Sequence, residues 1–137
     1  MQEEVGFEIV LAQEYEKAIE LVTSALKEQG FGILTRIDVK ETLKQKLDVD
    51  FRPYVILGAC NPPLAYKALT SDPKVGLMLP CNVTVEAHGS SGSVVRLTNP
   101  ALMVQFVEDP DQPGLQEAAV EATKRIRRVV ENLKQDE

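Results

Sequence analysis

The chain has 137 residues, with 21 acidic and 15 basic side chains, one His, two Cys and no Trp. This length suits a single domain over residues 1–137, and the hydrophobic share of 44% is typical of a globular protein rather than a disordered one. The net charge of -6 disfavours a surface for nucleic acid, which needs a basic field. No run of about 18 apolar residues occurs, so we predict no membrane span.

The first residues predict the compartment. Glu3 and Glu4 stand where a secretory signal carries basic residues, and no long apolar segment follows them. We therefore expect a cytoplasmic protein. In that compartment Cys60 and Cys81 are expected to be reduced rather than joined in a disulfide.

The N-terminal part predicts a strand followed by a helix. Val5, Phe7 and Ile9 recur at every second position, which predicts a strand over residues 5–11. Apolar residues over 13–29 recur at three- to four-residue spacing, which predicts an amphipathic helix. Gly30 then occupies the position of a left-handed helix C-cap.

A second strand and a short helix are predicted next. Phe31, Ile33, Thr35 and Ile37 alternate with the opposite face, which favours a strand over 31–39. Asp38 and Glu41 form a D-x-x-E variant of the capping box, in which Asp38 caps a helix and Glu41 reaches back to the cap. The short helix that follows has a narrow apolar stripe, formed by Val39, Leu43 and Leu47.

The middle of the chain predicts a buried strand that runs into a helix. Residues 54–60 are a continuous apolar run of strand length, typical of a buried central strand. Asn61-Pro62-Pro63 follows, with Asn61 suited to an N-cap and the prolines to the first helical turn. We predict a two-turn helix that ends at the turn over residues 71–73.

The C-terminal half predicts a β-hairpin and a long helix. Residues 81–87 alternate with Cys81 inward, residues 89–92 form the loop, and residues 93–98 form the return strand. Asn99-Pro100 opens an apolar segment through Val107, for which both a short helix and a strand remain open. A stripe from Leu115 to Leu133 predicts a long terminal helix, and helices near both ends with strands between them predict the α+β class.

Three blocks of sequence, residues 30–38, 54–63 and 76–83, resemble domain-of-unknown-function family 302, which is found in bacteria and archaea. The resemblance covers nearly the whole chain, and both cysteines fall on motif positions. It implies a curved, largely antiparallel sheet packed by helices and similar to the TATA-binding-protein-like class. Together with the elements predicted above, we expect about five strands, packed by two long and two or three short helices. The resemblance also implies a homodimer. No activity is established for the family, and this architecture serves unrelated tasks, so DNA binding is not implied.

The two cysteines carry the most informative chemistry. Cys60 ends the buried strand just before a helix N-terminus, where unpaired amides stabilise a thiolate. If its strand adjoins the strand that begins at Cys81, the thiols form a redox pair, a persulfide carrier or two soft-metal ligands. The alternative is that both thiols only fill space, as free cysteines often do. Asn61, Pro62 and Asn82 equally suit a purely structural turn.

Other kinds of site find little support. A structural zinc site needs four nitrogen or sulfur ligands, and His88 lies an odd number of residues after Cys81, on the opposite face of the strand. No phosphate-binding glycine motif is present. Asp38 fits its capping role better than acid–base catalysis. We expect no metal and no cofactor.

Lys124, Arg125, Arg127 and Arg128 form a basic run near the C-terminus. Glu121 lies four residues before Arg125, and Glu131 lies four residues after Arg127, so helix-surface ion pairs explain much of the run. We therefore expect no nucleic-acid partner. Apolar area over residues 129–130, beside the helix stripe, is a candidate for contact with a second copy.

These observations lead to two hypotheses. The first is a small cytoplasmic binding or accessory protein without enzymatic activity, which forms a homodimer and holds a small-molecule ligand in a pocket near the Cys60-Asn61-Pro62 turn. The alternative is a thiol-based redox, sulfur-carrier or soft-metal protein that uses Cys60 and Cys81.

Overall fold

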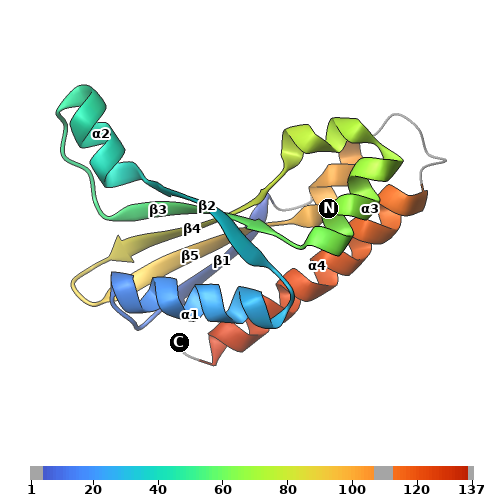
Figure 1. Ribbon diagram of the computed structural model, residues 1–137. Coiled ribbons are helices and arrows are strands. Elements are labelled where there is room, and N and C mark those ends of the chain that lie inside the picture. Colours follow the sequence, from blue (N-terminus) through green and yellow to red (C-terminus); the bar gives the residue numbers. More distant parts are fainter. Residues whose placement is uncertain (1–4, 107–112, 136–137) are drawn as a thin grey trace.

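The structure is a computed structural model, and it describes residues 5–106 and 113–135. Five strands form one antiparallel sheet in the order β1-β5-β4-β3-β2 (Figure 1). The predicted α+β class and the number of strands are therefore confirmed. The strands are β1 (Gly6–Leu11), β2 (Gly32–Asp38), β3 (Tyr54–Cys60), β4 (Cys81–His88) and β5 (Gly92–Thr98).

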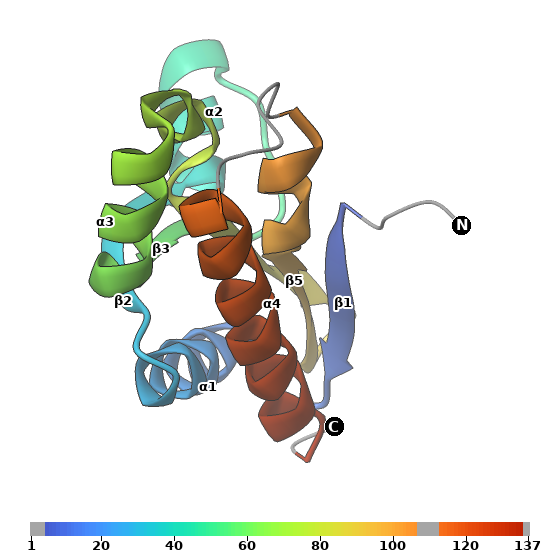
Figure 2. The same cartoon turned by 90° about the vertical axis from the view of Figure 1, so that its right-hand side faces the viewer.

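Two long helices cover one face of the sheet. α1 (Tyr15–Glu28) and α4 (Pro113–Lys134) lie against the same face of the sheet (Figures 1 and 2). Neither of these helices covers the opposite face, which we call the open face. The predicted stripe of α1 and the second half of the α4 stripe are buried against the covered face, and Gly30 adopts a positive φ of 85° just after α1. Alternate residues of the strands meet these helices in the main hydrophobic core, among them Ile9, Leu57, Val85 and Val95.

A second hydrophobic cluster lies beyond the end of the sheet. It joins α3 (Pro62–Ser71), the two 3₁₀ helices η1 (Pro73–Met78) and η2 (Pro100–Phe106), and the first half of α4. Ala68, Val75, Met103 and Leu115 pack at its centre. Of the two alternatives for the segment after Asn99, the helical one is confirmed as η2, while Val107 lies outside the described residues.

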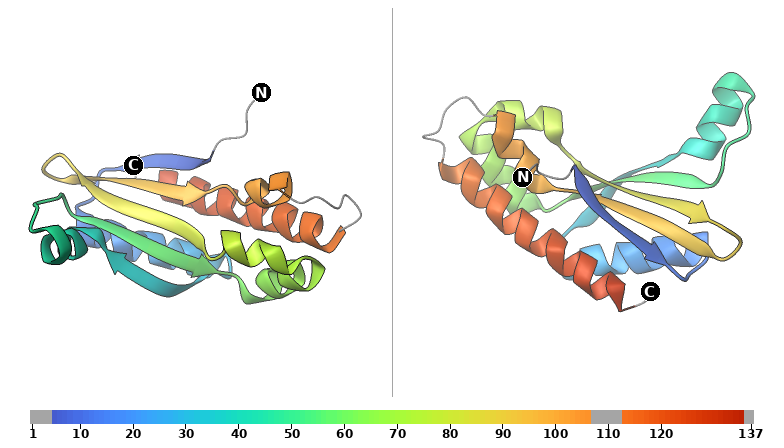
Figure 3. Two further views of the ribbon diagram at one scale, coloured as in Figure 1. Left: turned by 90° about the horizontal axis from the view of Figure 1, so that it is seen from above. Right: turned by 180° about the vertical axis from the view of Figure 1, so that it is seen from behind.

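The short helix α2 (Val39–Leu47) projects from the far end of the β2–β3 pair, away from the other helices (Figures 1 and 3). Asp38 caps it as predicted, by accepting from the Glu41 amide at 2.9 Å. The Glu41 carboxylate, however, accepts from Gln45 at 3.1 Å instead of reaching back to the cap. None of the α2 residues is buried: Val39 and Leu43 of the predicted stripe are only partly covered, and Leu47 is exposed.

β2 departs from the predicted alternation. The register with β3 shifts between Ile33 and Thr35, which leaves Leu34 as the extra residue of a bulge. Ile33 is partly buried, but Ile37, which was predicted to share its face, is exposed. The prediction of one continuous apolar face was wrong because a bulge changes which residues share a face.

Two expectations for α4 are corrected. Val129 and Val130 are buried in the core of this chain, so they are not spare surface for a second copy. The Glu121–Arg125 ion pair is confirmed at 2.8 Å, but Arg127 lies over the Phe7 ring and Glu131 pairs with Lys134. Within the described ranges, no helix is both long enough and apolar enough to cross a bilayer.

Candidate functional site

The turn from β3 into α3 positions the first candidate residues. Cys60 is the last residue of β3, and Asn61 caps α3 by accepting from the Leu64 amide at 3.3 Å. The two prolines occupy the first turn, where no amide hydrogen is needed. The predicted helix start is confirmed, and it fixes Cys60 beside the positive end of the α3 dipole.

Both cysteines lie at the same end of two neighbouring strands. β3 and β4 pair antiparallel, so the strands adjoin as the thiol-pair hypothesis requires, but the residue directly opposite Cys81 is Ala59 rather than Cys60. Cys81 is 7% exposed and Cys60 is partly exposed. Both are free thiols, as expected.

Burial, together with a smaller contribution from the nearby Cys60, raises the pKa of the Cys81 thiol to about 11. At neutral pH Cys81 is therefore a protonated thiol and a poor nucleophile. Only a ligand that displaces its proton, such as a soft metal ion, makes it a thiolate there. Any nucleophilic role falls instead to Cys60, which is more exposed and adjoins the α3 N-terminus.

A small crevice opens beside these thiols, between the two hydrophobic clusters. About 30 Å³ is open to the centre of a water-sized sphere, which is room for about two water molecules. The walls are mainly apolar and come from β3, α3, α4 and the residues around them: Phe31, Ala59, Leu64, Ala65, Ala68, Leu79, Ala118 and Ala122. The remaining lining residues are Cys60, Asn61, Cys81 and Met103.

Met103 is the site residue that sequence reasoning missed. It lies in η2 and is 6% exposed, so its side chain is held inside the second cluster where that cluster meets the crevice. Nothing in the local sequence indicates this position, because it depends on how η2 packs against α3 and α4.

The other predicted residues fall outside the crevice. Pro62 is exposed in the first turn of α3, and Asn82 is exposed on β4, where its carbonyl accepts from the Thr98 hydroxyl at 2.7 Å. Asp38 pairs with Val55 at the opposite end of the β2–β3 ladder from Cys60. His88 is likewise at the far end of β4 from Cys81. Among the described residues, no group of three or more His, Cys, Asp and Glu side chains is placed to hold a metal.

The rim of the crevice is clamped to the end of α1. The Gln29 carbonyl accepts from the Arg125 guanidinium at 3.1 Å and, more weakly, from the Asn61 amide at 3.5 Å. A Cβ atom at Gly30 would lie 3.0 Å from the Asn61 amide nitrogen and 3.1 Å from Arg125, so glycine lets the three elements approach. A guanidinium therefore lies next to Asn61.

A buried carboxylate lies on the open face of the sheet, at Glu86. Alternation predicted an outward side chain, yet Glu86 is 6% exposed because Arg52 and Arg96 both bond to it and cover it. Burial raises the pKa of Glu86, but the hydrogen bonds and charges of Arg96 and Arg52 outweigh it, and the pKa lies below its usual value. A carboxylate held in this way is a structural anion rather than a general base.

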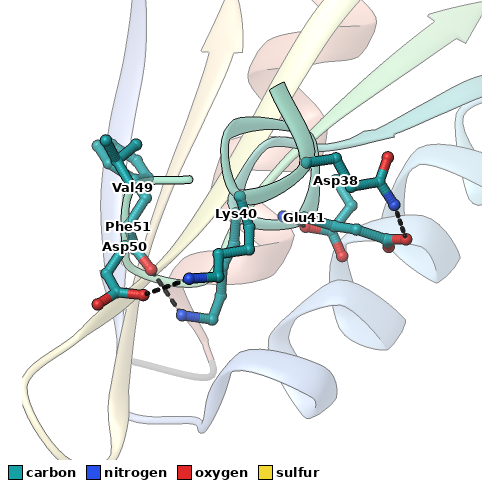
Figure 4. A pocket seen from close by; sticks show the side chains of 8 residues that line it. Asp38, Lys40, Glu41, Val49, Asp50 and Phe51 are labelled. Atoms are coloured by element: carbon teal, nitrogen blue, oxygen red, sulfur yellow. Dashed lines mark hydrogen bonds and ion pairs between the residues drawn. The ribbon is translucent and has the colours of Figure 1, made fainter. Parts of the chain in front are cut away.

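A larger hollow of about 550 Å³ lies between α2 and the return segment 49–51 (Figure 4). Its polar groups are bonded to one another: Lys40 donates to the Phe51 carbonyl at 2.8 Å, and Lys44 pairs with Asp48 at 2.8 Å. This hollow therefore lacks the convergent, unpaired polar groups of a small-molecule site.

Comparisons with known proteins agree with the fold. The family model for the domain of unknown function DUF302 matches residues 7–133. The crystal structure of an uncharacterised conserved DUF302 protein from Bacillus stearothermophilus is similar at 29% sequence identity, with a TM-score of 0.82 over 98% of this chain and 100% of that one. A search of the curated proteins finds no match. On the family match, which spans nearly all of the sequence, the chain belongs to the DUF302 family.

Proposed function

We propose that the chain is a homodimeric binding or accessory domain whose ligand occupies the crevice beside Cys60 and Asn61. The observation that supports it is the position of the crevice, at the joint between two separately packed clusters. Its volume of about 30 Å³ limits the ligand to a few heavy atoms.

The lining favours binding over catalysis. Among the described residues that line the crevice, Asn61 is the only polar side chain without sulfur, and none is a carboxylate, histidine or lysine. General acid–base chemistry needs such a group within hydrogen-bonding reach of the substrate. The crevice can hold a small ligand, and its two thiols are the groups there that could exchange a proton.

Xenon tests whether the crevice accepts a ligand, because it enters small apolar cavities. We expect dissolved xenon to shift the amide resonances of Ala59, Cys60 and Ala122. Ala65→Leu, which fills the crevice from a partly exposed wall, should abolish these shifts. Ala101→Leu, the same change in a different groove, should leave them intact. Unshifted crevice amides in the wild-type protein contradict the proposal.

The assembly is tested separately by light scattering. We expect a mass near twice 15.1 kDa at micromolar concentration. A mass of 15.1 kDa under the same conditions argues against the homodimer.

The thiol-based alternative is favoured by one further observation, the presence of Met103 in the same crevice. Three sulfur-containing residues then line a space the size of a single ion: Cys60, Cys81 and Met103. Thiolate and thioether ligands select Cu(I). On binding, Cu(I) would displace the Cys81 proton to solvent, and the positive end of α3 would favour the remaining negative charge.

An anaerobic Cu(I) titration against a competing chelator tests this alternative. The reduced wild-type protein should bind one equivalent, Cys81→Ser should lose binding, and Met103→Leu should weaken it. Met78→Leu, a matched change in η1 outside the crevice, should bind as the wild type does. If Cu(I) does not bind and both thiols resist labelling until the protein unfolds, the cysteines have only a packing role.

A further inference from the structure

The β2–α2 arm, residues 32–50, carries apolar side chains that nothing in the described chain covers. α2 has nine residues and buries none of them, although an isolated helix of this length is marginal in water. Leu34 is 67% exposed and Leu47 is 65% exposed, while Ile37 and Val49 are also exposed. A helix with this much exposed apolar surface gains stability when a partner covers it.

The strand of the arm also has an open edge. β2 is at the end of the sheet and pairs with β3 on one side only. Beyond the bulge at Leu34, residues 35–38 return to regular pairing, so their outer backbone groups form an accessible edge. Two copies of one strand pair antiparallel about a two-fold axis, which is the symmetry of a homodimer.

Charge on the arm points to a second copy as the partner. The arm carries as many basic as acidic side chains, although the whole chain has a net charge of -6. Two molecules that repel each other elsewhere therefore meet here without net repulsion, and each acidic group can face a basic one across a two-fold axis. The basic residues are Arg36, Lys40, Lys44 and Lys46, and the acidic ones are Asp38, Glu41, Asp48 and Asp50.

We propose that two copies dock arm to arm, with β2 beside β2 and the exposed apolar residues of both arms covered between them. At about 3.3 Å per strand residue and 1.5 Å per helix residue, β2 and α2 together run roughly 37 Å. A strip of that length needs a width of about 22 Å to bury the ~800 Å² per partner of a standard interface. The hollow between α2 and residues 49–51 gives side chains of the second copy a place to insert. This inference rests on the proposed homodimer and assigns its surface.

A rival apolar surface lies at the other end of the molecule, at Tyr66 and Leu77, which is 91% exposed. Those residues project from α3 and η1, elements that already bury Ala68 and Val75 in the second cluster. They are extra apolar side chains on elements that already pack in a cluster, whereas α2 of the arm has no buried residue.

Paired lysine variants distinguish the two surfaces. In light scattering, Ile37→Lys with Leu47→Lys should raise the dimer dissociation constant more than about tenfold, because exposed lysines on a strand edge oppose pairing. Tyr66→Lys with Leu77→Lys, a matched double change on the rival surface, should leave the dimer intact. The opposite pattern overturns the arm assignment and keeps the homodimer, whereas a monomeric wild type overturns both.

A second measurement leaves the sequence unchanged, in case the arm variant does not fold. Labelled and unlabelled wild-type protein are mixed, and isotope-filtered nuclear Overhauser effects are recorded from the Ile37 and Leu47 methyl groups. We expect contacts from these methyls to the second copy. A dimer in which both sets of methyls show only contacts within one chain refutes the proposal.

Discussion

Glu86 shows how a correct strand pattern can hide a buried charge. Its position on β4 predicted the open face of the sheet, and its side chain does lie there. Arg52 lies just before β3 and Arg96 lies in β5, so the burial of Glu86 depends on how these strands pair with β4. Residue alternation predicts a face, but it does not predict which neighbours close over that face.

Glu86→Gln should destabilise the protein by about 2 kcal/mol at neutral pH, because it removes the buried charge that both arginines bind. The loss is no larger because both arginine side chains keep partial access to solvent. The pKa of Glu86 is lowered by folding, so its contribution is present above the ordinary carboxyl pKa and is lost as pH falls through the lowered value. Urea unfolding at neutral and acidic pH should therefore show a gap between variant and wild type that narrows in acid.

Glu20→Gln provides the control, since Glu20 is an exposed helix residue 3.8 Å from Lys17. It should change the free energy of unfolding by less than about 0.5 kcal/mol at either pH. An effect of Glu86→Gln no larger than this control would rule out the assigned role.

The cysteines and Met103 show what local sequence can and cannot predict about the crevice. Cys60 and Asn61 were identifiable because a strand end followed by a proline-rich helix start is a local signal. Whether the strand of Cys81 lies beside the strand of Cys60 could be stated only as a condition, because local sequence does not determine strand order. Met103 had no such signal, because tertiary packing of η2 brings it to the site.

At the scale of elements, the helix starts were the most predictable features. Asp38 and Asn61 each cap a helix through bonds made within three residues along the chain. β2 was less predictable, because its bulge responds to the partner strand rather than to its own alternation.

Asn61→Ala should cost about 1 kcal/mol of stability, since the Leu64 amide loses its acceptor at the start of α3. Chemical denaturation measures the change. Asn82→Ala, at an exposed strand position, is the matched control and should have a smaller effect. Equal losses in the two variants would mean that the cap contributes nothing specific.

Gly58, in the middle of β3, lies close to Thr35 of β2 and to Pro80, the residue just before β4. A Cβ atom there would overlap the Thr35 hydroxyl and lie 2.8 Å from the Pro80 ring. Gly58→Ala should therefore destabilise the fold by about 1–3 kcal/mol. Adding Thr35→Ala should recover part of that loss by removing the nearer contact, as thermal melts of both variants would show. A Gly58→Ala protein as stable as the wild type is incompatible with this packing.

At the scale of the whole molecule, α4 joins the two hydrophobic clusters. Its first half packs in the cluster with α3 and η2, and its second half packs under the sheet. The sequence stripe predicted the buried face of this helix, but not that the face divides between two clusters with a crevice at their joint. The stripe on α2 was equally visible in the sequence, yet the described chain covers Val39 and Leu43 only in part and leaves Leu47 exposed.

The account depends most on the claim that a second copy completes the arm. Amide hydrogen exchange of α2, measured over a series of protein concentrations, tests it most directly, because a nine-residue helix with no buried residue is protected only when it is covered. We predict that protection of the α2 amides rises with concentration while that of β3 and β4 stays constant. Fast exchange in α2 that does not change with concentration would contradict the claim.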